Sequence, residues 1–75
     1  MGKLGSMKPA VFRAFLKGEG WEYARTKGDH EIWHRTGAKR PVVFQKTGDL
    51  PTFVLLNNLR TMGLQRDDLV KWLAK

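Results

Sequence analysis

The sequence contains no cysteine, and no run of apolar residues in it approaches the roughly 20 needed to cross a bilayer. The first absence excludes disulfide bonds and thiolate metal sites, and it fits a reducing compartment. An apolar signal segment is absent as well, so we expect a cytoplasmic protein with no membrane partner. Acidic residues are scarce: 7 Asp and Glu stand against 14 Lys and Arg, for a formal net charge of +7.

A charge of this size on 75 residues favours a polyanionic partner such as RNA, or an acidic protein. The length allows one small domain with a limited core. Residues 1–6, followed by a second methionine at position 7, are typical of a cloning remnant. We therefore assign the single domain to residues 7–75, which carry a net charge of +6 once Lys3 is removed.

Apolar residues recur at helical spacing in three segments, and three others contain the aromatic and β-branched residues that favour strands. The expected helices span residues 8–18, 51–62 and 66–75, and the expected strands span residues 21–27, 30–35 and 41–46. Gly18, Gly20 and Gly63 are expected to end helices, and Asp49 to cap the second one. The order α-β-β-β-α, with a possible extra C-terminal helix, predicts an α+β domain with helices on one face of a three-stranded antiparallel sheet.

The segment Lys27-Gly28-Asp29-His30 joins the first two strands, because glycine adopts the positive φ that a tight turn requires. His30 then stands at the first position of the second strand. Histidine exchanges protons near neutral pH, so it is the natural candidate for acid–base chemistry in this basic chain.

The second strand leaves one alternative open. His30, Ile32 and His34 share one face, and Trp33 lies on the other. If Trp33 is buried, both histidines face outward. If Ile32 is buried, His30 can still reach solvent from the end of the strand, whereas His34 cannot.

These features resemble the HicA family of bacterial toxins. The matching residues are Gly20-Trp21, then Lys27-Gly28-Asp29-His30, and the apolar Val42-Val43-Phe44, in a basic chain of this length. The resemblance implies a fold like that of the double-stranded-RNA-binding domain. It also implies an mRNA interferase, an endoribonuclease that works without a metal or another cofactor, and a HicB-like antitoxin as partner.

By this resemblance His30 is the catalytic residue, which would take the proton of a ribose 2′-hydroxyl as that oxygen attacks the adjacent phosphate. The candidates for RNA contacts are Lys27, Gly28, Arg35, Lys39 and Arg40. We expect no metal site, because His30 and His34 lack an evident third ligand.

Asp29 departs from the family pattern, which usually has serine between the glycine and the histidine. A carboxylate at this position would repel an incoming phosphate. The alternative hypothesis is therefore a non-catalytic module of the same fold that binds RNA or an acidic protein.

Overall fold

The computed structural model describes residues 4–75. Residues 1–3, the first half of the segment interpreted as a cloning remnant, lie outside the described residues. The elements are α1 (Pro9–Gly18), β1 (Glu22–Lys27), β2 (His30–His34), β3 (Val42–Gln45), α2 (Thr52–Thr61) and α3 (Arg66–Leu73). The predicted α+β class and element order are confirmed, and each expected element is present with ends shifted by a few residues at most.

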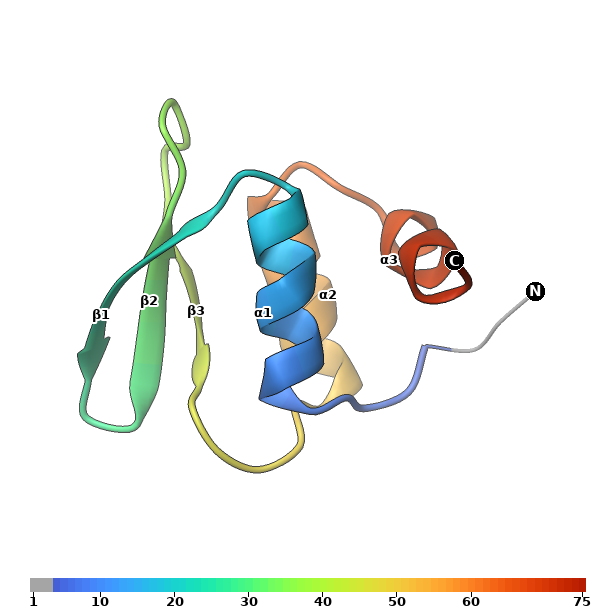
Figure 1. Cartoon of the computed structure of the whole chain (residues 1–75), viewed down its shortest axis with the longest axis horizontal. Helices are drawn as coiled ribbons and strands as arrows, with labels where there is room; N and C mark the ends of the chain where they lie inside the picture. Colours follow the sequence, from blue (N-terminus) through green and yellow to red (C-terminus); the bar gives the residue numbers. More distant parts are fainter. Residues whose placement is uncertain (1–3) are drawn as a thin grey trace.

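The three strands form one antiparallel sheet in the order β1-β2-β3. Helices α1 and α2 lie side by side against one face of this sheet, and α3 lies beyond them (Figure 1). No helix within residues 4–75 covers the opposite face, which we call the open face (Figure 1). The predicted placement of the helices on one face of the sheet is confirmed.

The core lies between the sheet and the helices, and aromatic rings fill much of it. The ring of Phe44 on β3 meets that of Phe12 on α1 edge-on, with centroids 5.2 Å apart, and it stacks on Trp33 of β2 at 6.4 Å. All three side chains are almost fully buried. These contacts determine which face of each strand turns toward the helices.

Glycines end both long helices in the same way. Gly20 has φ +87° and Gly63 has φ +75°, values that other residues rarely adopt. After α1, the N–H of Trp21 donates to the carbonyl of Leu16 (2.9 Å), and after α2 the N–H of Leu64 makes the equivalent bond to Leu59 (2.9 Å). These bonds satisfy carbonyls that would otherwise lack partners at the helix ends.

The start of α2 differs from the prediction. The residue before the helix is Pro51, in an extended conformation, and Asp49 does not cap it. Proline fixes φ at this N-cap position and has no N–H of its own, and no side chain makes a capping hydrogen bond at this end of α2.

The C-terminal helix packs on the domain. Leu69 is completely buried, and Trp72 meets Phe15 of α1 edge-on at 5.3 Å between centroids. Leu4 joins the same core with only 7% of its surface exposed, and its carbonyl accepts a hydrogen bond from the Thr52 hydroxyl (3.3 Å). Residues just ahead of Met7 thus contribute to the packing.

The outer edge of β3 is covered by a side chain of α2. The Asn58 amide donates to the carbonyl of Val43 (3.0 Å), and its oxygen accepts from the Val43 N–H (3.4 Å). Asn58 therefore takes the place of a further strand at this position.

None of the helices within residues 4–75 is both long enough and apolar enough to span a membrane.

Candidate nucleic-acid interface

The orientation of β2 resolves the alternative that the sequence left open. Trp33 is 2% exposed and faces the helices, so His30 and His34 lie on the open face, and both are exposed. Ile32 lies between them and is nevertheless buried (8% exposed), because Arg25 on β1 and Val43 on β3 flank it in the register of the sheet. The apolar pattern alone could not show whether Ile32 or Trp33 faces the helices, because both side chains are buried.

Glu31 shares the helix-facing side with Trp33 and is held there by two partners. Arg13 of α1 donates to both of its carboxylate oxygens (3.0 Å from Nε to each), and the Trp33 indole N–H donates to one of them (3.0 Å). Burial opposes ionisation of Glu31, but these bonds outweigh it and hold the pKa of Glu31 below its usual value. The Arg13 side chain is 31% exposed, so the ion pair lies at the border of the core between α1 and the sheet.

His30 lies where β1 turns into β2. It pairs with Lys27 on β1 and with Gln45 on β3, and all three side chains belong to the open face. Gly28 in the turn has φ +60°, as predicted, while Asp29 keeps a negative φ. The Asp29 carbonyl accepts from the N–H of Lys46 (2.8 Å), which ties the turn to the end of β3.

Arg25 joins the open face although the sequence analysis did not single it out. Tyr23 pairs with Trp33 and Arg25 with Ile32, so Ala24 is an extra residue in β1. Such a β-bulge shifts the alternation of the strand. The bulge puts Tyr23 on the helix side against Trp33, whereas Arg25, two residues from Lys27, shares the face of His30.

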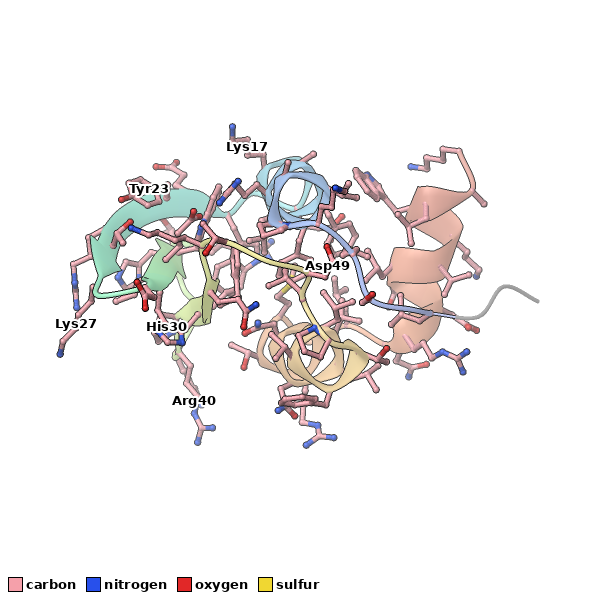
Figure 2. All side chains as sticks on the ribbon, turned by 90° about the horizontal axis from the view of Figure 1, so that it is seen from below. Lys17, Tyr23, Lys27, His30, Arg40 and Asp49 are labelled. Carbon is pink, nitrogen blue, oxygen red and sulfur yellow. The ribbon has the colours of Figure 1, made fainter. Side chains whose placement is uncertain are left out.

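The predicted catalytic histidine and the five predicted RNA contacts fall into two groups at opposite ends of β2. Lys27, Gly28 and His30 lie at the β1–β2 turn, whereas Arg35, Lys39 and Arg40 belong to the loop between β2 and β3. All six are exposed, and Figure 2 shows the side chains of Lys27, His30 and Arg40 projecting outward at the sheet side of the molecule. The structure does not gather the six residues around one point.

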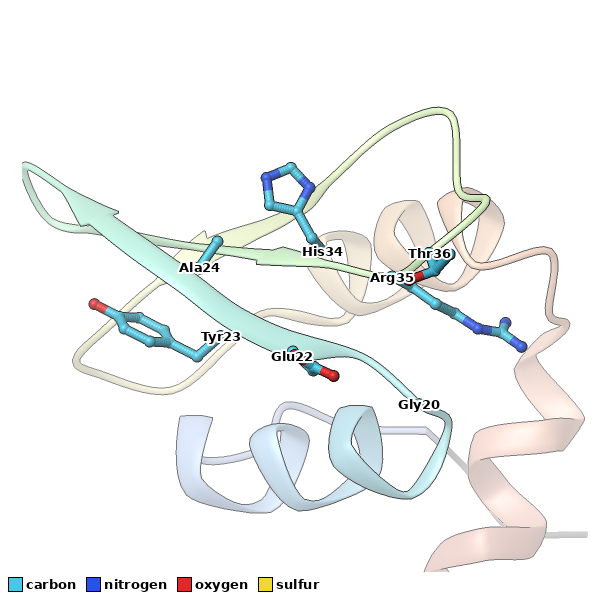
Figure 3. Close-up of a pocket in the computed structure, with 7 residues that line it drawn as sticks. All are labelled: Gly20, Glu22, Tyr23, Ala24, His34, Arg35 and Thr36. Carbon is cyan, nitrogen blue, oxygen red and sulfur yellow. The ribbon is translucent and has the colours of Figure 1, made fainter.

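His34 lies between the two groups, at the border of a shallow depression of about 360 Å³. Glu22, Tyr23 and Arg35 also line this depression. Figure 3 shows His34 on one side of the ribbon and Tyr23 on the other, with Arg35 extending away from the imidazole. The lining residues therefore lie on both sides of the strand ends, and Tyr23 and Arg35 do not point toward the His34 imidazole.

The two imidazoles cannot act on the same atom. They are four residues apart on one strand, which separates their Cα atoms by roughly 13 Å at about 3.3 Å per residue. This separation is too large for a shared metal ion or for an acid–base pair at one phosphate. Within residues 4–75 no group of three or more His, Asp or Glu side chains is placed to hold a metal.

Comparison of the chain with models of protein families, with curated proteins and with solved structures returned no match. The resemblance to HicA toxins therefore rests on sequence motifs such as Lys27-Gly28-Asp29-His30 alone.

Proposed function

We propose that this protein binds RNA on the open face of its sheet and cleaves it with His30 as the base, in the manner of a HicA toxin. The observation that carries the proposal is the burial of Trp33, which turns both histidines outward together with Arg25 and Lys27. An exposed imidazole beside cations on a flat, uncovered sheet suits a large anionic substrate.

In the proposed reaction, His30 takes the proton from a ribose 2′-hydroxyl. The 2′-oxygen forms a bond to the adjacent phosphorus as the bond from phosphorus to the 5′-oxygen breaks. The products are a 2′,3′-cyclic phosphate and a 5′-hydroxyl, whose oxygen takes its proton from the imidazolium or from water. Lys27 lies directly across from His30 and stabilises the charge that develops on the phosphate. Dependence on the 2′-hydroxyl makes the reaction selective for RNA.

The same face suits the second partner that the family resemblance implies. An acidic HicB-like antitoxin would pair its carboxylates with the cations of the open face and cover His30, which inhibits the toxin by exclusion of RNA. Both partners place the protein in the cytoplasm.

A second candidate function is RNA binding without cleavage. It is favoured by the exposed position of His30 beside the β1–β2 turn: His30 does not line the depression beside His34, the one at Lys39 and Arg40, the one beside Trp21 or the one beside Asp49. Asp29 beside it also opposes a closely held phosphate.

Single-turnover cleavage of a labelled RNA oligonucleotide by wild type, His30→Ala and His34→Ala separates these functions. General-base catalysis predicts a loss of at least about 100-fold in His30→Ala and a much smaller loss in His34→Ala. Equal rates in wild type and His30→Ala would exclude His30 as the base. RNA binding by wild type with a steep salt dependence but no cleavage would establish the second candidate.

A further inference from the structure

A second basic surface lies beyond the β2–β3 loop, away from His30. Lys39 and Arg40 of the loop and Arg60 in the last turn of α2 line one depression of about 490 Å³. Asn57 and Thr61, one turn apart on α2, complete it. Three cations with two hydrogen-bonding side chains around one hollow are the groups that bind phosphate oxygens in proteins.

The lining of this hollow, which we call the loop pocket, contains no carboxylate. Two other depressions on the described surface differ in this respect, because one includes Glu22 and the other includes Asp49. The pocket lies at the C-terminal end of α2, where the helix dipole disfavours an anion, and its three cations have to outweigh this effect. The carbonyls of Leu59 and Arg60 already accept bonds from the N–H groups of Leu64 and Gly63, so their negative ends are occupied.

We infer that the loop pocket is a phosphate-binding subsite, which holds a backbone phosphate of the RNA strand at the end of the sheet opposite His30. This inference rests on the proposed RNA-binding function and adds Arg60 and α2 to the interface. It explains why the predicted contacts divide into two groups: the turn presents the reacting imidazole, and the loop pocket anchors the strand roughly one β2 length away.

The test uses Arg60→Gln and, as a matched control, Arg66→Gln, which removes the same charge from an exposed position on α3. Binding of a single-stranded RNA oligonucleotide is measured over a range of salt concentrations. For a single strand, loss of one phosphate contact reduces the steepness of log K against log salt concentration by about 0.7. We expect this decrease and at least a threefold weaker affinity in Arg60→Gln, with the wild-type slope in Arg66→Gln.

A titration with pyrophosphate, followed by NMR of backbone amides, examines the pocket without RNA. We expect shifts at residues 38–40 and 57–61 in wild type and Arg66→Gln, and their loss in Arg60→Gln.

Each outcome is decisive. If RNA binds but the two variants behave alike, the subsite is wrong and the proposed function stands. If pyrophosphate shifts these residues but RNA does not bind, the proposed function fails and the RNA role of the pocket fails with it.

Discussion

Glu31 carries an acidic group into the sheet of a strongly basic protein, and its environment explains why it stays ionised there. It is 8% exposed, and its partners Arg13 and Trp33 join the second strand to the first helix. The same contacts orient β2, because Glu31 and Trp33 can both face the helices only if the histidines face outward. A single ion pair thus supports the exposure of His30.

The lowered pKa of Glu31 gives a pH dependence of stability. Burial works against the carboxylate but the bonds from Arg13 and Trp33 prevail, so the ionised group stabilises the fold above its ordinary pKa of 4.5. That contribution is lost as the pH falls through the lower, folded-state value.

We therefore predict that Glu31→Gln lowers the free energy of unfolding by about 1–2 kcal/mol at pH 7 and much less at pH 3. Urea unfolding at the two pH values measures the difference. Glu22→Gln makes the same change at an exposed position and should have little effect at either pH. An equal loss from Glu31→Gln at both pH values would contradict the account.

The turn at Gly28 yields a second residue-scale prediction. A Cβ added at Gly28 or at Gly5 meets no atom within 4 Å, and of the two only Gly28 has a positive φ. Gly28→Ala should destabilise the protein by about 1–2 kcal/mol through backbone strain alone. Gly5→Ala should be close to neutral. Thermal unfolding of both variants checks this, and a neutral Gly28→Ala would argue against the turn geometry that presents His30.

At the scale of elements, β3 is an edge strand that α2 protects. The two hydrogen bonds between the Asn58 amide and the backbone of Val43 close the edge at the level of Ile32. They also hold α2 against the sheet, which brings Arg60 beneath the β2–β3 loop.

Asn58→Leu should cost about 2–4 kcal/mol, because it leaves the N–H and C=O of Val43 without partners. Asn57→Leu is the matched control. Asn57 is exposed, and the amide bond to the β3 backbone comes from Asn58 instead. Hydrogen exchange at the Val43 amide should accelerate only in the first variant. Unchanged exchange there would show that the edge is protected by other means.

Some features of the elements could be predicted from the sequence, and others could not. The turn at Gly28 and the stop at Gly63 were predictable, because few residues besides glycine adopt a positive φ. The orientation of β2 was not, since Ile32 and Trp33 are both buried and the deciding contact comes from Arg13, 18 residues away. Nor could the sequence show that Arg60 meets Lys39 and Arg40, because that depends on how α2 packs against the edge of the sheet.

Over the whole molecule, the hydrophobic core extends from the sheet through α1 and α2 to α3 and Leu4. Most of the aromatic and large aliphatic side chains gather on the helix side, whereas the open face carries Arg25, Lys27 and the two histidines around Ile32 and Val43. The concentration of cations and histidines on the uncovered face of the sheet is the basis of the proposed function.

Leu4 tests how far this core reaches toward the N-terminus. Leu4→Ala should lower the free energy of unfolding by about 2 kcal/mol, the lower end of the range for buried leucines, since a little of its surface is exposed. Leu73→Ala removes the same atoms from a side chain that is 43% exposed and should cost clearly less. Chemical denaturation of both proteins makes the comparison, and equal effects would contradict the packing of Leu4.

The most direct test of the central claim is an NMR titration with a 2′-O-methyl RNA oligonucleotide, which binds but lacks the attacking hydroxyl. We predict that the largest amide shifts fall on Arg25, Lys27, His30 and His34, the residues of the open face, and that they weaken as salt is added. Shifts confined to α1 and α3, or no shifts at low salt, would contradict the account.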